Sequence, residues 1–190
     1  MYEAMFKDGM YHLWEDQQTL CTPAGNPVTA EQSCLAERLV QHLEQYGKDP
    51  ENRCSVLLFH YPRLDLVQHY PRGRIVRLIL TYLDLKFEWE IRDEAPSGTA
   101  PAEPSGKSSP GQFRTAEARE WLKNLSLNQL CATLVLSKIL GSMNHVLWVS
   151  RLQGSTATDG LIRQLILREP LLGKEPLAEL LANFRFYWEL

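Results

Sequence analysis

Residues 11–27, YHLWEDQQTLCTPAGNP, decide the class of fold of this chain. The apolar residues Tyr11 and Leu13 stand before a polar turn at 15–18, and the second arm ends in the Pro- and Gly-containing run 23–27. Apolar alternation on both sides of a polar turn is typical of a β-hairpin. The chain is therefore expected to contain a small β element near its start.

A helix is expected directly after this hairpin. The stretch Thr29–Gln32 has the form of a capping box, and Leu35, Leu39 and Leu43 then recur at helical spacing until Gly47. This pattern predicts a helix that begins at the capping box and ends at the glycine.

Three more segments complete the N-terminal part. The apolar run 55–61 predicts a short buried strand, and Pro71 opens a helical pattern that includes Val76 and Ile79. From residue 83 to 92 apolar side chains alternate with charged ones, which predicts a strand with one buried face.

The composition changes after residue 92. Residues 93–113 are rich in Pro, Ser, Gly and Ala and show no periodicity, which is typical of a flexible linker. Helical patterns follow at 115–123, at 126–141 with a capping box at its start, and at 142–153, 158–168 and 176–190. The sequence predicts an α+β fold with a small β-containing lobe at 1–92, the linker at 93–113 and a helical lobe at 114–190.

Composition and charge narrow the classes of function. The 190 residues are 44% hydrophobic and 23% charged, and the net charge is -3. A chain of this balance gives no electrostatic reason to bind nucleic acid. The longest apolar stretch, 130–140, is interrupted by Lys138 and is too short to span a membrane.

The cysteines and the first residues suggest a compartment. Four cysteines without paired spacing favour reduced thiols. Residues 1–8 carry acids and lack the features of a signal or transit peptide. We expect a cytoplasmic protein, or one of the mitochondrial matrix if a presequence has been removed.

No pattern of catalytic or metal-binding residues stands out. His-Tyr-Pro-Arg occurs at 60–63 and again at 69–72, but its spacing fits two X-Pro turns better than a metal site. Cys34 and Cys131 lie in apolar helical patterns, where cysteine is usually part of the core. The sequence predicts neither enzyme activity, nor a cofactor, nor a metal.

The chain contains one basic cluster that could hold RNA. Arg63, Arg72, Arg74 and Arg77 form a cluster, but the neighbouring acids favour a solvated helix face instead.

Several stretches, in order along the chain, form a recognisable pattern: Thr22–Pro27 with Leu35–Glu37, Leu64-Asp65 with Tyr82–Asp84, Ile91–Pro96, Leu140–Met143, and Arg168-Glu169. Together they resemble the assembly chaperones that bind the alpha subunit of F-type ATP synthase. The resemblance implies a β-containing N-terminal domain, a helical C-terminal domain and binding of the unassembled alpha subunit without ATP. The Gln and Trp-Gly that follow the acidic residue in that family are replaced here by Pro170–Gly173.

The resemblance implies a partner-binding role for Glu169. It follows the apolar side chains Leu165 and Ile166, and an acid beside such a surface is suited to pair with an Arg or a backbone N–H of a client. Phe186 joins this predicted site because the aromatic run 184–190 places rings on more than one side of a helix.

Two other functions remain open. Residues 66–92 resemble the first β-α-β unit of glutathione transferases, which implies that Tyr70 activates the thiol of glutathione. A helical adaptor or scaffold with an unrelated partner is the third reading.

Overall fold

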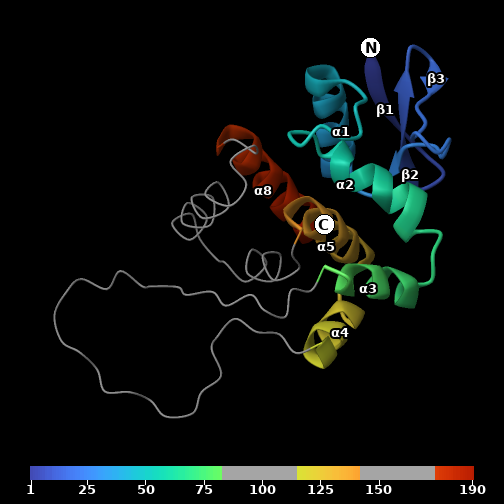
Figure 1. Cartoon of the computed structure of the whole chain (residues 1–190). Coiled ribbons are helices and arrows are strands. Elements are labelled where there is room, and N and C mark those ends of the chain that lie inside the picture. The colour runs from blue at the N-terminus through green and yellow to red at the C-terminus, as the bar shows by residue number, and fades with distance from the viewer. Residues whose placement is uncertain (83–114, 142–173) are drawn as a thin grey trace, which may run out of the picture.

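The computed structural model describes residues 1–82, 115–141 and 174–190 and begins with a small antiparallel sheet (Figure 1). Its strands are β1 (Tyr2–Lys7), β2 (Met10–Glu15), β3 (Gln18–Thr19) and β4 (Thr29–Ala30). β1 pairs with one edge of β2, while β3 and β4 share the other edge. The predicted hairpin is confirmed, and β1 adds a strand that the sequence analysis missed.

Both hairpin turns have the backbone that strand twist favours. Asp8 and Gly9 join β1 to β2, and Asp16 and Gln17 join β2 to β3, all four with positive φ. Two consecutive residues of positive φ form the type I′ turn, which matches the right-handed twist of the strands. This sheet is therefore built from short local connections.

Helix α1 (Ser33–Tyr46) covers one face of the sheet and buries Leu35, Leu39 and Leu43. It ends at Gly47, whose φ is 72°, as predicted. The predicted start was wrong, because Thr29 and Ala30 pair with β2 as strand β4. The N-cap is Gln32, whose side chain makes no capping hydrogen bond.

The predicted strand at 55–61 is wrong, because this segment contains helix α2 (Leu57–Pro62). A π-helical turn, η1 (Arg63–Val67), continues it. Leu57, Phe59 and Tyr61 are all buried, so the helix is enclosed on several sides. A continuous apolar run is common to buried strands and buried helices, and periodicity does not distinguish them.

The remaining described helices agree with the sequence patterns. They are α3 (Arg72–Leu80), α4 (Thr115–Lys123), α5 (Leu127–Leu140) and α8 (Lys174–Glu189). The predicted capping box at Ser126 is formed with Gln129, and α5 ends at Gly141 in the left-handed conformation. The predicted strand at 83–92, the linker at 93–113 and the helices at 142–153 and 158–168 lie outside the described residues.

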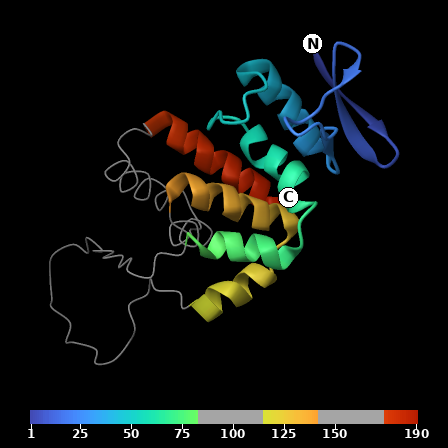
Figure 2. The ribbon, with the colours of Figure 1, turned by 45° about the vertical axis from the view of Figure 1, so that its right-hand side comes forward.

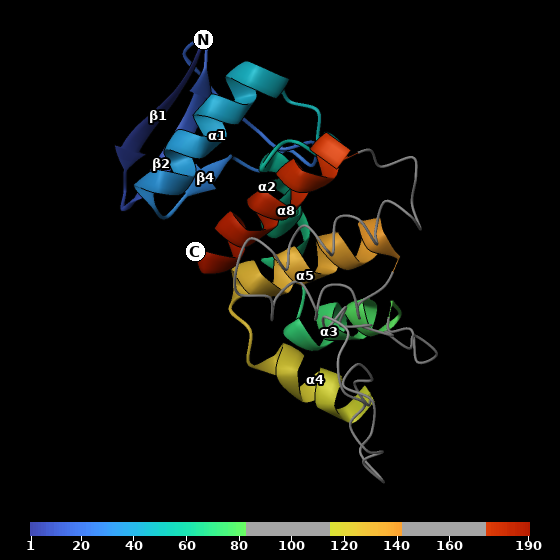
Figure 3. The same ribbon diagram turned by 90° about the vertical axis from the view of Figure 1, so that its left-hand side faces the viewer.

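The helices stack in the order α8, α5, α3, α4, with the sheet and α1 beside the α8 end (Figures 2 and 3). α5 lies inside this stack and is buried around most of its circumference. Buried side chains from before residue 83 and after residue 114 form one hydrophobic cluster. The α+β class predicted from the sequence is confirmed.

The C-terminal aromatic residues belong to this core. Phe184 and Tyr187 are buried against Phe59, with ring centroids 6.3 and 6.0 Å from it. Trp188 stacks on Trp121 of α4 at 5.9 Å. α8 therefore ties the end of the chain to both α2 and α4.

Candidate functional site

An apolar groove of about 740 Å³ opens where α2, η1, α3 and α5 meet. We call it the α3–α5 groove. Its apolar wall includes Leu58, Tyr61, Leu66, Leu78, Leu134 and Ile139. Leu78 is 41% exposed, and Leu134 and Tyr61 are buried in the floor. Burial raises the pKa of Tyr61 to about 12, so its hydroxyl stays protonated at neutral pH.

Charged side chains stand at the rim of the groove. Arg53 and Lys138 are exposed, and neither makes an ion pair with any other residue in the described ranges. Glu51 stands nearby on the same loop as Arg53 and is also exposed. An apolar floor with exposed cations at its rim suits a segment that is apolar on one side and acidic at its edge.

Asp65 of η1 is an acid at the rim whose carboxylate accepts hydrogen bonds from within the protein. Its Oδ1 accepts hydrogen bonds from Thr22 Oγ1 at 2.5 Å and from Asn26 Nδ2 at 2.8 Å. The backbone N–H of Asn26 donates in turn to Thr22 Oγ1 at 3.2 Å. Asp65 thus fixes the loop 22–27, which carries Pro23 to the groove.

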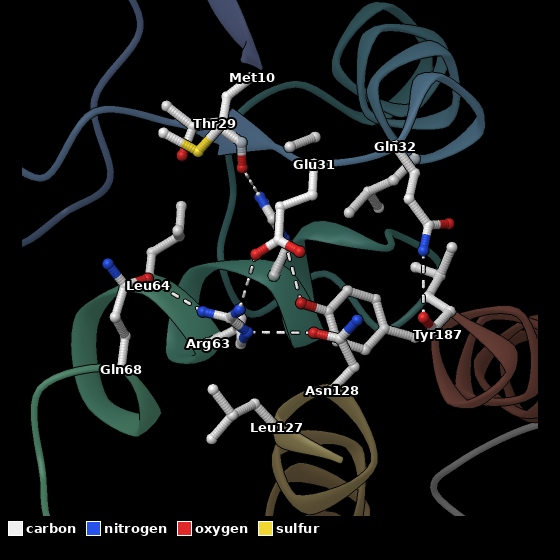
Figure 4. A pocket seen from close by; sticks show the side chains of 14 residues that line it. Met10, Thr29, Glu31, Gln32, Arg63, Leu64, Gln68, Leu127, Asn128 and Tyr187 are labelled. Atoms are coloured by element: carbon white, nitrogen blue, oxygen red, sulfur yellow. Dashed lines mark hydrogen bonds and ion pairs between the residues drawn. The ribbon is translucent and has the colours of Figure 1, made fainter. Parts of the chain in front are cut away.

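A second, smaller and more polar pocket of about 200 Å³ lies between the sheet, η1 and the ends of α5 and α8 (Figure 4). Arg63 enters it and is largely committed to protein partners. Its guanidinium donates to Asn128 Oδ1 at 3.0 Å and to Gln68 Oε1 at 2.9 Å, and it pairs with Glu31 at 3.4 Å. These contacts join three elements and neutralise the cation.

The wall of this polar pocket contains a buried histidine with a defined tautomer. His60 Nε2 lies 2.8 Å from the carbonyl oxygen of Thr29, which only accepts, so Nε2 carries the hydrogen. Nδ1 then accepts from the hydroxyl of Tyr187 at 3.1 Å. Burial lowers the pKa of His60 to about 4 and raises that of Tyr187 well above its usual value. His60 is a neutral structural group at pH 7.

The repeated His-Tyr-Pro-Arg is only partly explained by turns. Pro71 precedes α3 in an extended conformation, as expected, but Pro62 lies inside α2, so the first turn was predicted wrongly. Within the described ranges, no three His, Cys, Asp or Glu side chains come together as a metal site.

Of the four arginines in the basic cluster, two bind other protein groups and two are exposed to solvent. Arg63 is bound as described, and Arg72 donates to the carbonyl oxygens of Leu122 and Leu125. The solvated-face prediction is therefore wrong for these two. Arg74 and Arg77 are exposed, as predicted.

Cys34 and Cys131 were both predicted to lie in the core, and only Cys131 does. Cys131 is buried, its thiol donates to the carbonyl oxygen of Phe59 at 3.2 Å, and burial raises its pKa to about 12. Cys34 is exposed, so its assignment to the core was wrong.

Phe186 is the one predicted partner-binding residue within the described ranges. It is half-buried on α8, and the guanidinium of Arg38 lies over its ring at 4.7 Å from the centroid. Arg38 also donates to Asn183 Oδ1 at 2.8 Å, so these contacts hold α1 against α8. Phe186 does not line the α3–α5 groove. Glu169, Leu165 and Ile166 lie outside the described residues.

Tyr70, the residue implied by the glutathione transferase resemblance, is 39% exposed. The guanidinium of Arg74 lies over its ring at 4.3 Å from the centroid. The segment before it is the π-helical turn η1, where the resemblance implies a strand.

Sequence reasoning missed the α3–α5 groove because its wall comes from separate stretches of the chain.

Comparisons with family models, with curated proteins and with solved structures found no match. Among the helices of the described segments, none combines the length and the apolar character that a bilayer crossing requires.

Proposed function

We propose that this chain works by binding another polypeptide in the α3–α5 groove, without ATP and without catalysing a reaction. The observation that carries the proposal is the groove itself, an open apolar hollow of about 740 Å³ whose rim carries two exposed cations that form no ion pair within the described residues. Exposed apolar surface of this kind is typical of protein-binding sites.

The resemblance to ATP synthase assembly chaperones gives this binding a more specific form. Three of the stretches that carry it contribute a residue to the groove: Pro23, Asp65 and Tyr82. Two of these stretches are also joined directly, because Thr22 and Asn26 both donate to Asp65. The proposed client is therefore the unassembled alpha subunit of F-type ATP synthase, held so that its exposed interface does not self-associate.

The chemistry of the groove defines the part of the client that it takes. Leu66, Leu78 and Ile139 offer apolar contact, while Arg53 and Lys138 offer positive charge at the edge. A client segment with an apolar face and at least one acidic side chain satisfies both. Close opposite charges at the edge of an interface mainly increase the association rate and the specificity.

The test compares two exposed leucines of nearly equal accessibility. Leu78 is 41% exposed in the groove, and Leu127 is 42% exposed at the start of α5, outside it. Each is replaced by Glu in the full chain, and capture of purified alpha subunit is measured by pull-down and by suppression of light scattering. We expect Leu78→Glu to weaken capture about tenfold, as loss of a central apolar contact does, and Leu127→Glu to leave capture unchanged.

The rim charges provide an independent comparison. Lys138→Glu is expected to slow association at low salt, whereas Lys123→Glu, on the exposed side of α4, is expected to have no effect. Equal capture by the wild-type chain and by Leu78→Glu would exclude the groove as the binding site. Failure of the wild-type chain to hold the alpha subunit would exclude that client.

A further inference from the structure

Strand β1 lies at an edge of the sheet that the described residues form. It pairs with β2 along one side, and β3 and β4 both pair with the other side of β2. Figure 3 shows β1, β2 and β4 of this sheet. No other strand in the described part of the chain pairs with β1. An unpaired edge strand presents a row of N–H and C=O groups to which another strand can add.

Hydrogen bonding within the sheet shows which backbone groups point outward. Leu13, the partner of Ala4, donates its N–H to Val28 and accepts from Leu20, both on the side away from β1. Asp16 instead donates to Met1, on the β1 side. Because the direction alternates along an antiparallel pair, the N–H and C=O groups of Tyr2, Ala4 and Phe6 point away from the sheet.

Four side chains along this edge are exposed, and two of them carry opposite charges. Met5 and Phe6 are 42% and 64% exposed. Glu3 and Lys7 stand two residues before and two residues after Met5, on the same face of the strand. Neither makes an ion pair with another described residue.

We propose that β1 pairs with β1 of a second copy of this chain, antiparallel and centred on Met5. In this register the outward backbone groups of Ala4 bond those of Phe6 of the partner subunit, and the two-fold axis repeats the pair. Glu3 then lies directly opposite Lys7 of the partner subunit, and Lys7 lies opposite Glu3 of the partner subunit. Both pairs occupy non-hydrogen-bonded positions, where the facing side chains come closest.

The neighbouring registers lack this complementarity. Centring the pair on Ala4 places Glu3 opposite Met5 of the partner subunit, and centring it on Phe6 places Lys7 opposite Met5 of the partner subunit. The outward backbone groups can pair in all three registers, so the charges of Glu3 and Lys7 select the one centred on Met5. α1 covers only one face of the sheet, so the face with Glu3, Met5 and Lys7 continues across the pair.

The size of the contact sets the expected strength. A single pair of six-residue strands is small beside the interfaces of stable complexes. The pair is expected to form in the micromolar range and to leave the α3–α5 groove open, because no β1 residue lines that groove.

The test is sedimentation velocity of the full chain over a concentration series, with folding of each variant checked by circular dichroism. In a pair of Glu3→Lys chains, or of Lys7→Glu chains, positions 3 and 7 that face each other carry the same charge, and the two-fold axis repeats this repulsion. Each variant is therefore expected to weaken self-association about tenfold. An equimolar mixture of the two variants is expected to restore it, because Lys then faces Glu at every position. Glu120→Lys and Arg119→Glu, exposed on α4 at the other end of the molecule, are the matched controls.

A backbone variant tests the strand pairing separately. Ala4→Pro removes an outward N–H that β2 does not use, so the monomer is expected to fold and the pair to be lost. A wild-type chain that stays monomeric at several hundred micromolar would overturn the proposal. Self-association that survives both Ala4→Pro and the single charge reversals would overturn it equally.

Discussion

Acidification should destabilise the fold through His60. The imidazole is buried and neutral, accepting from Tyr187 and donating to Thr29. Burial lowers its pKa from 6.5 to about 4 in the folded chain. As the pH falls from 6.5 towards 4, the unfolded chain takes up a proton at His60 and the folded chain does not. The free energy of unfolding contributed by this group is therefore complete above pH 6.5 and is lost below it.

The two pKa values give the size of the effect. With about 4 in the folded chain and the ordinary value of 6.5 in the unfolded chain, lowering the pH from 7.5 to 5 removes about 2 kcal/mol. His42 acts in the same direction, because burial lowers its pKa too and its Nδ1 accepts from the N–H of Val56. A comparison with a His60 variant isolates the contribution of His60.

The assay is urea unfolding at pH 7.5 and pH 5, followed by tryptophan fluorescence, for the wild-type chain and for His60→Gln. The variant is expected to be less stable at pH 7.5, because Tyr187 and Thr29 lose their partner. Its further loss of stability at pH 5 should be smaller than that of the wild type by about 2 kcal/mol. An equal loss in both chains would refute the assignment of His60 as a buried neutral group.

Three further predictions concern the groove and the parts of the chain beside it. Asp65→Ala removes the acceptor of Thr22 and Asn26, and urea unfolding is expected to show a loss of about 2 kcal/mol together with weaker client capture. Limited proteolysis of the native protein is expected to cut first within residues 93–113, whose polar composition offers little to offset chain ordering, and to leave two resistant fragments; protection of this segment would contradict the predicted division into two lobes. Glu169→Ala is expected to weaken capture of the alpha subunit without lowering the melting temperature, because the acid is proposed to contact the client and not the core; unchanged capture would remove it from the site.

The sequence predicted elements well where local signals and the tertiary structure agree. The capping box at Ser126 and the left-handed Gly141 delimit α5 because both signals act within one turn of the helix. The same signal gave a wrong helix start at Thr29, because Thr29 pairs with β2 as part of strand β4. Asp8-Gly9 is a strong hairpin signal that would have revealed β1.

Other features depend on contacts that no local pattern contains. The run 55–61 became helical because its apolar residues are enclosed by α5 and α8, which follow more than 50 residues later in the sequence. The α3–α5 groove likewise combines loops, η1 and three helices, α2, α3 and α5, of which α5 is distant in sequence from the other two. The family resemblance included single residues of the groove, such as Pro23 and Asp65, but it did not predict the groove.

Photocrosslinking tests the central claim most directly. A photoreactive amino acid is placed at position 78 or at position 127, two sites of nearly equal exposure, and the full chain is irradiated with purified alpha subunit in the absence of ATP. We predict a crosslink to the client from position 78 and none from position 127. A crosslink from position 127 alone, or binding that persists with no crosslink from position 78, would contradict the account.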